Sequence, residues 1–128
     1  MLRTIFLIIA GTYALSCFGA EYSCQVTRKL DREHEYAAEQ IAKSQYSNRI
    51  EEANTGTFVS RCSLAPSVGK VTCDRYKIDR VEFDENVGIK KYYLFRSQYD
   101  FQLFADLSFV ESNGRGGLAY GSCKLVSP

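Results

Sequence analysis

The segment with the clearest potential for recognition chemistry is Asn113-Gly114-Arg115-Gly116-Gly117, which carries one arginine among three glycines. Glycine adopts the positive φ values that turns and bulges need, so a hairpin turn with a bulge explains this composition without any function. The alternative is a presented loop, because loops on a rigid scaffold often carry binding residues and an arginine can bind a carboxylate through two parallel hydrogen bonds. We therefore take Asn113, Gly114, Arg115 and Gly116 as the candidate binding loop.

Catalytic chemistry has few candidates. The only histidine, His34, lies between two glutamates at a polar helix start, where a solvated helix residue is the favoured interpretation. A single histidine excludes a zinc site with two or three histidine ligands and leaves a serine nucleophile with one available base. A hydrolase that uses two acids needs only a suitable pair of carboxylates, and the candidates are Glu33, Glu35, Asp79, Asp84 and Glu85. No pair stands out, so no catalytic, cofactor-binding or metal-ligating residue is assigned.

The cysteines have the pattern of a disulfide framework. Five are present, and the first, Cys17, falls in an N-terminal segment that resembles an export signal, which leaves an even four: Cys24, Cys62, Cys73 and Cys123. Four cysteines in a small exported domain typically form two disulfides. A structural zinc site is not favoured, because none of the four are paired at the two-to-four-residue spacing of zinc ligands.

The local sequence favours one of the three possible pairings. Two strand-like runs flank Ala65–Gly69, a turn with proline and glycine. If the strands pair around this turn, the numbers of opposed residues sum to 135, and Cys62 lies directly opposite Cys73. Opposed residues of an antiparallel ladder are close enough for a disulfide. Cys24 then pairs with Cys123, which joins the first strand to the last.

The first twenty residues read as a secretory signal peptide. Residues 5–15 form an uncharged apolar run after a single basic residue. Eleven helical residues rise about 16 Å, which is short of the roughly 30 Å hydrocarbon core of a bilayer. We expect the mature chain to start at Ala20 or Glu21. Because a lipobox-like sequence precedes Cys17, lipid anchoring through Cys17 is the alternative.

The remaining residues, 21–128, are expected to form one β-rich domain. The pattern predicts one short helix over 32–44 with Asp31 as its N-cap. Period-two alternation and turn signals predict strands over 21–28, 45–52, 57–64, 70–76 continuing to 83, 88–96, 101–104, 107–111 and 117–126. Such strands favour an antiparallel meander closed as a barrel or folded as a sandwich. The first-to-last disulfide is expected to join strands that would otherwise be edges.

The last hairpin has a specific predicted register. Asn113-Gly114 is the preferred centre of a two-residue type I′ turn, which makes opposed residues sum to 227. This register sets Phe109 opposite Leu118 and Leu107 opposite Tyr120. The four apolar side chains would then share one buried face.

Charge restricts the classes of partner. The chain has 16 basic and 15 acidic residues, and Arg3 is the only charged residue of the first twenty. The mature domain is therefore formally neutral, which argues against a general nucleic-acid binder and against a polybasic membrane-surface protein. We expect a monomer without cofactor, with a protein or cell-envelope partner and no transmembrane segment in the mature chain.

A resemblance covers the mature chain. An export signal, Tyr22-x-Cys24, Arg61-Cys62-Ser63, Thr72-Cys73-Asp74-Arg75-Tyr76 and the closing Asn113 to Cys123 segment resemble small exported bacterial proteins of uncharacterised function, a resemblance that implies no activity. In size, export and strand content the chain is also similar to periplasmic inhibitors of c-type lysozyme, but their Ser-Gly-x-x-Tyr loop is absent.

These observations favour a non-enzymatic exported or periplasmic module that binds a macromolecule, for example as an inhibitor does. The alternatives are a secreted hydrolase that depends on carboxylates and a structural protein of the envelope.

Overall fold

The computed structural model describes residues 19–127. The expected signal peptide, with Cys17, thus lies outside the described residues except for its last two positions. Of these, Ala20 directly precedes the first strand, and its carbonyl accepts a 2.9 Å hydrogen bond from Glu52 N–H. Across residues 19–127, no helix has the length and apolar character of a membrane span.

The described chain forms one antiparallel sheet of nine strands in the order β4-β3-β2-β1-β9-β8-β7-β6-β5. The elements are β1 (Glu21–Leu30), α1 (Ala38–Ser44), β2 (Ser47–Ala53), β3 (Gly56–Ala65), β4 (Lys70–Lys77), β5 (Arg80–Asp84), β6 (Ile89–Leu94), the 3-10 turn η1 (Phe95–Ser97), β7 (Tyr99–Leu103), β8 (Ser108–Ser112) and β9 (Leu118–Ser127). The prediction of a mainly β fold is confirmed. Its strand ranges agree with the structure to within a few residues, except that the predicted run from 70 to 83 is two strands, β4 and β5, separated by Ile78 and Asp79.

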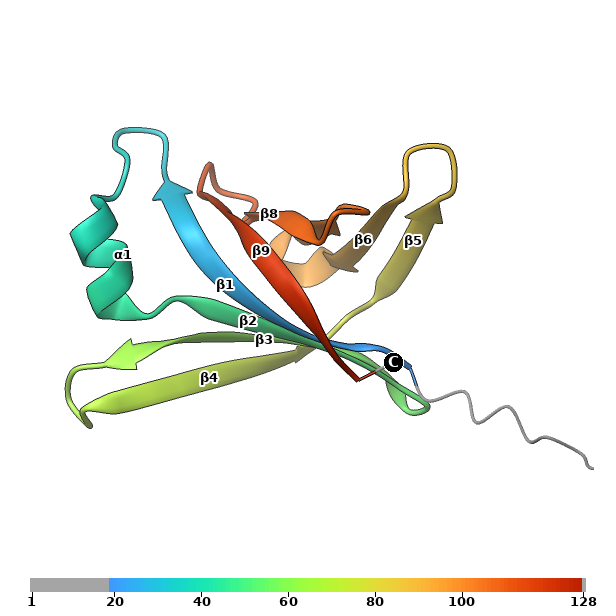
Figure 1. Cartoon of the computed structure of the whole chain (residues 1–128), viewed down its shortest axis with the longest axis horizontal. Helices are drawn as coiled ribbons and strands as arrows, with labels where there is room; N and C mark the ends of the chain where they lie inside the picture. Colours follow the sequence, from blue (N-terminus) through green and yellow to red (C-terminus); the bar gives the residue numbers. More distant parts are fainter. Residues whose placement is uncertain (1–18, 128) are drawn as a thin grey trace, which may run out of the picture.

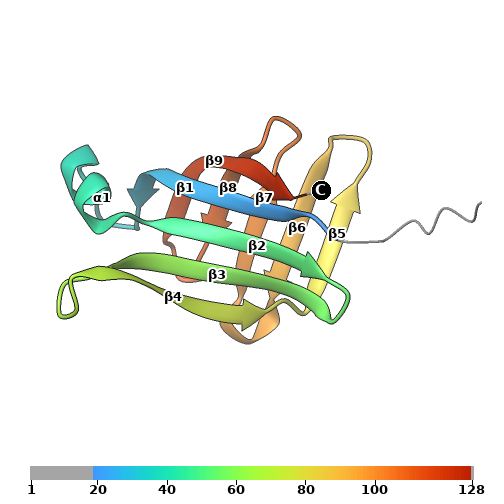
Figure 2. The same ribbon diagram turned by 60° about the horizontal axis from the view of Figure 1, so that its bottom comes forward.

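The sheet curls into a half-barrel with two halves (Figure 1). We call β1–β4 the N-terminal half and β5–β9 the C-terminal half. Strands β2–β4 run nearly across β6–β8 in Figure 2, so the two halves lie as layers with the core between them. The chain passes from one half to the other through Ile78 and Asp79. Ile78 N–H donates to Thr57 of β3 at 2.8 Å, and Asp79 N–H donates to Tyr93 of β6 at 2.9 Å.

As expected from the predicted Cys24–Cys123 disulfide, the first and last strands are joined to each other and are not edges. β1 and β9 pair with each other at the centre of the sheet, and the edges are β4 and β5. The reason is topological: once the two terminal strands pair, the free edges fall to the strands in the middle of the chain. The curled sheet is therefore continuous across the two terminal strands of the chain, β1 and β9, and its free edges are β4 and β5.

Both predicted disulfides are present. Cys24 is opposite Cys123 in the β1–β9 ladder, and Cys62 is opposite Cys73 in the β3–β4 ladder. The predicted register around the Ala65–Gly69 turn is confirmed, because opposed residues of β3 and β4 sum to 135. The Cys24–Cys123 bridge is buried at the centre of the sheet, whereas Cys73 is exposed on the edge.

The helix is shorter than the predicted span of 32–44. It covers only Ala38–Ser44, and Asp31 caps a turn before it instead. The Asp31 carboxylate accepts the backbone N–H groups of Glu33 at 2.8 Å and of His34 at 3.0 Å. Such local side-chain bonds compete with helix formation, which explains why the acidic segment does not join the helix.

The predicted register of the last hairpin is also wrong. Opposed residues sum to 230, so Phe109 lies opposite Gly121 and not opposite Leu118. The connection is a five-residue loop, 113–117, because the side chain of Asn113 bonds two N–H groups within it. The three-residue shift leaves Leu118 partly exposed and Phe109 only 2% exposed.

Gly121 makes room for the aromatic part of the core. A Cβ there would lie 2.7 Å from the Phe109 ring and 1.9 Å from the carbonyl oxygen of Gln25. The Phe109 ring in turn stacks on Phe101 with centroids 4.7 Å apart. Side chains alternate along a strand, so Glu111, two residues after Phe109, faces the same interior.

Candidate functional site

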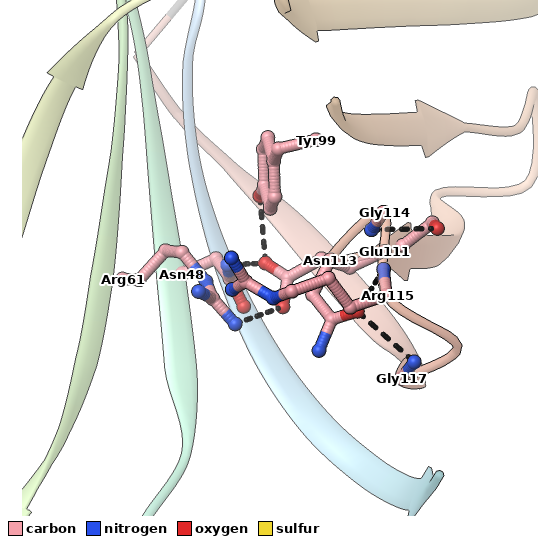
Figure 3. A network of polar contacts seen from close by, with 9 residues as sticks. Asn48, Arg61, Tyr99, Glu111, Asn113, Gly114, Arg115 and Gly117 are labelled. Atoms are coloured by element: carbon pink, nitrogen blue, oxygen red, sulfur yellow. Dashed lines mark hydrogen bonds and ion pairs between the residues drawn. The ribbon is translucent and has the colours of Figure 1, made fainter. Parts of the chain in front are cut away.

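Glu111 lies in the interior at the centre of a polar network. Its side chain is 6% exposed and accepts three hydrogen bonds from three different strands. Oε1 accepts from Nη2 of Arg61 on β3 at 3.1 Å, and Oε2 accepts from the Tyr99 hydroxyl on β7 at 2.7 Å and from the Asn48 amide on β2 (Figure 3). A buried carboxylate is tolerated when it is paired and hydrogen-bonded in this way. The network connects the two halves of the sheet.

Electrostatics keep two members of this network, Tyr99 and Arg61, protonated. Burial, and then the adjacent Glu111 carboxylate, raise the pKa of Tyr99 well above its ordinary value, so the phenol stays a hydrogen-bond donor. Burial alone would lower the pKa of Arg61, but Glu111 together with Tyr99 and Tyr76 outweighs it, and the pKa is raised. The Arg61 guanidinium also lies 5.4 Å from the centre of the Tyr99 ring, within cation–π distance.

Next to the network is a small hollow, of about 80 Å³, between the two halves of the sheet. We call it the arginine hollow. Its lining comes from β3, β4, β6, β7, η1 and the 113–117 loop, and consists of Arg61, Tyr76, Leu94, Ser97, Tyr99, Asn113 and Arg115. Two guanidinium groups, from residues 54 positions apart in the sequence, thus open onto one space. No carboxylate is among the described residues that line it.

The 113–117 loop has a defined conformation that presents Arg115. Asn113 Oδ1 accepts the backbone N–H of Arg115 at 2.8 Å and of Gly117 at 3.0 Å. The Arg115 side chain is directed toward Arg61 over the network (Figure 3). It is exposed, and within residues 19–127 it forms no ion pair. The Asn113 side chain therefore stabilises the loop conformation, and the Arg115 guanidinium is available to a ligand.

Two glycines fit this loop against its surroundings. Gly114 has a φ of +75°, and a Cβ there would lie 2.5 Å from the carbonyl oxygen of Gln98, just after η1. A Cβ on Gly116 would meet the side chain of Arg32. Of the four residues proposed from the sequence, Asn113 and Arg115 line the hollow, while Gly114 and Gly116 are packing positions.

The sequence reasoning missed Arg61, Tyr99, Glu111 and Asn48. The signal available for Glu111 was its place in an alternating strand, at the same parity as Phe109. A charged residue at an inward position is unusual and requires partners. No sequence pattern identifies those partners, because they lie on strands that meet only in the folded sheet.

The other sequence candidates lie away from the arginine hollow. His34 is exposed and lies 3.1 Å from the Asp31 carboxylate. Among the acids considered for hydrolysis, Glu35 binds Arg28, and Asp79 accepts the N–H of Phe95. Asp84 and Glu85 line an open hollow of about 730 Å³ at the β5–β6 hairpin. In the part of the chain that the structure describes, no three His, Cys, Asp or Glu side chains are grouped to hold a metal ion.

Comparison with known proteins adds no relative: no protein-family model, curated protein or solved structure matches this chain.

Proposed function

We propose that this protein is a non-enzymatic exported module that binds a macromolecular partner at the arginine hollow. The observation that carries the proposal is the placement of Arg61 and Arg115, from opposite halves of the sheet, around one solvent-open space. Glu111, the acid that forms an ion pair with Arg61, is buried and already accepts three hydrogen bonds. The hollow thus offers cationic donors in excess of the acceptors that the protein itself supplies.

The size of the hollow favours a large partner. Sites that enclose a small molecule usually measure about 300–1,000 Å³, whereas this hollow measures about 80 Å³. It has room for one functional group and not for a whole metabolite. A group bound there would belong to a larger molecule lying across the rim, which includes the exposed Tyr76 and Arg115.

Export is supported by the covalent structure. Two disulfides form and persist in oxidising compartments and are rare in the cytosol. The apolar N-terminal run of residues 5–15 supports the same location, periplasmic or secreted.

The hydrogen bonding of Glu111 favours a non-enzymatic role over a carboxylate-dependent hydrolase. A general acid or nucleophile must reach the substrate with a free oxygen, but both oxygens of Glu111 accept hydrogen bonds inside the protein. A structural role in the envelope without a ligand predicts a different result, because no interaction would then depend on Arg115.

The proposal is tested with three immobilised proteins: wild type, Arg115→Gln and Arg96→Gln. Arg96 is a matched control, since it is an exposed arginine on η1 that does not line the hollow. Each is exposed to envelope and medium fractions of cells that produce the chain. We expect wild type and Arg96→Gln to retain the same macromolecule, and Arg115→Gln to retain at least about tenfold less, as expected for a lost charged contact. Equal retention by all three, or no retained molecule, would contradict the proposal.

A further inference from the structure

We infer that the arginine hollow takes a single carboxylate on a short apolar stem, the side chain of an aspartate or glutamate or the C-terminus of a protein partner, held between Arg61 and Arg115. The inference rests on the proposed function and specifies the chemistry of the group bound there. Three properties of the hollow support it: its net charge, its free donors and its walls.

Net charge distinguishes a carboxylate from a phosphate. Arg61 and Arg115 contribute two positive charges, and the Glu111 carboxylate behind Arg61 contributes one negative charge. The residues that line the hollow, taken with Glu111, have one positive charge left, which a carboxylate monoanion neutralises. Asp74, opposite Arg61 in the β3–β4 ladder, is exposed and does not line the hollow. A phosphate group that carries nearly two negative charges would leave uncompensated charge in a partly buried space, which is unfavourable.

The free donors have the geometry that a carboxylate needs. A guanidinium carries five N–H donors in a planar fork, and Arg61 directs one of its nitrogens, Nη2, to Glu111. Within residues 19–127 the Arg61 side chain has no other hydrogen bond, so its remaining N–H groups are available to a ligand. Arg115 supplies a second fork from the loop, and its backbone position is set by Asn113. Paired forks of this kind match the two oxygens of a carboxylate.

The walls suit a short apolar stem. Tyr76, Leu94 and Tyr99 line the hollow together with the two arginines. Its volume of about 80 Å³ is several times the ~10–15 Å³ that a cavity needs to hold one water molecule on the same measure. A carboxylate with one or two methylene groups fits that space, and the methylenes would pack on Leu94 and the tyrosine rings.

The test is a titration of the intact protein followed by the Nε–H signals of arginine side chains in NMR spectra. The probes are N-acetylglutamate α-amide for a side-chain carboxylate, N-acetylalanine for a chain terminus, inorganic phosphate, and neutral N-acetylglutamine amide. We expect one or both carboxylates to shift the signals of Arg61 and Arg115 at millimolar concentration, and to bind at least about tenfold more weakly to Arg115→Gln. Arg96→Gln, the matched control, should bind as wild type does. The carboxylate probe that binds more tightly shows whether the natural group is an acidic side chain or a chain terminus.

Other outcomes would overturn the inference. Phosphate that binds more tightly than both carboxylates, the neutral amide shifting the same signals, or unchanged carboxylate binding in Arg115→Gln would each exclude a carboxylate site. Failure of the proposed function is a separate result. If a macromolecule is retained through Arg115 but no carboxylate probe shifts Arg61 or Arg115, the binding module stands and only the carboxylate assignment is wrong.

Discussion

Arg61 on β3 donates a 3.1 Å hydrogen bond to Glu111 on β8, and this ion pair joins the two halves of the curled sheet. The two residues are 50 positions apart in the sequence. Glu111 is almost completely buried, whereas the Arg61 side chain is 36% exposed. Glu111 is therefore held in the interior, whereas Arg61 extends to the surface. The ion pair positions Arg61 where it lines the arginine hollow.

The first prediction concerns the coupling between these two residues. Glu111→Gln should lower the free energy of unfolding by about 1.5–3 kcal/mol, because it removes the buried carboxylate that accepts the hydrogen bond of Arg61. Arg61→Gln should also destabilise, and the double variant should lose less than the sum of the two by about 0.5–3 kcal/mol. Urea unfolding of the four proteins measures this coupling. Strictly additive losses would show that the pair contributes no coupling energy.

The second prediction is a loss of stability at alkaline pH. Burial and then the Glu111 carboxylate raise the pKa of Tyr99 above 10.0. An unfolded tyrosine ionises near pH 10, so above that pH the unfolded state loses a proton that the folded state keeps. The contribution is complete below pH 10 and is lost as pH rises. Burial and the hydrogen bond to Glu52 raise the pKa of Tyr92 in the same direction.

Tyr99→Phe isolates the part of this loss that belongs to Tyr99. Above pH 10 the dependence of unfolding free energy on pH should become shallower by up to about 1.4 kcal/mol per pH unit. Urea unfolding at a series of pH values between about 8 and 11.5 gives the slope. An identical slope for Tyr99→Phe and wild type would show that Tyr99 ionises normally in the folded protein.

The third prediction compares two glycines with positive φ. Gly69→Ala, at φ +67° with no atom within 4 Å of the added Cβ, should cost about 1–2 kcal/mol from backbone strain alone. Gly114→Ala, at φ +75°, adds a contact of 2.5 Å with the carbonyl oxygen of Gln98 and should cost ~1–3 kcal/mol more. Thermal or urea unfolding of the two variants gives the difference. Equal costs would mean that the 113–117 loop does not rest on the turn after η1.

The fourth prediction ranks the disulfides. They span 99 and 11 residues, and in the chain-entropy model a loop of about 100 residues contributes roughly 4.7 kcal/mol against about 3 for one near 15. Replacing Cys24 and Cys123 together by alanine should therefore destabilise more than replacing Cys62 and Cys73. Burial of the first pair adds to its cost. A larger loss of unfolding free energy from the Cys62 and Cys73 replacement would reverse this ranking.

The fifth prediction separates folding from binding. Phe109 is 2% exposed and stacks on Phe101, so Phe109→Ala should cost about 3–5 kcal/mol. Arg115 is exposed and forms no ion pair among the described residues, so Arg115→Gln should change stability by no more than about 0.5 kcal/mol. Melting curves of both variants beside wild type test the difference. If Arg115→Gln melts as low as Phe109→Ala, Arg115 is a structural partner and the loop is not the binding site.

Short-range features of this protein were predictable from its residues. The Cys62–Cys73 bridge follows from a turn with proline and glycine that sets the register of two adjacent strands. Once Cys62 and Cys73 are paired, Cys24 and Cys123 are the two cysteines of residues 21–128 that remain to pair. The alternation of polar and apolar residues likewise indicated the strands, because side chains in a sheet repeat every two residues.

Local predictions failed where a side chain bonded the backbone beside it. Asp31, which the sequence predicts as a helix cap, closes a separate turn, and Asn113 enlarges a hairpin loop predicted to have two residues. Both residue types favour several local conformations of similar energy, and neighbouring packing selects among them. For the 113–117 loop, the contact of Gly114 with the turn after η1 is part of that selection.

The amino-acid sequence by itself determined the strand content, the two disulfides and the loop that carries Arg115. Only the tertiary structure decided what Arg115 faces. Arg61, Tyr99 and Glu111 come from β3, β7 and β8, which the curl of the sheet brings together around one carboxylate. The physical reason is that strand pairing is settled by burial over the whole sheet, so a site assembled across two layers has no local pattern in the chain.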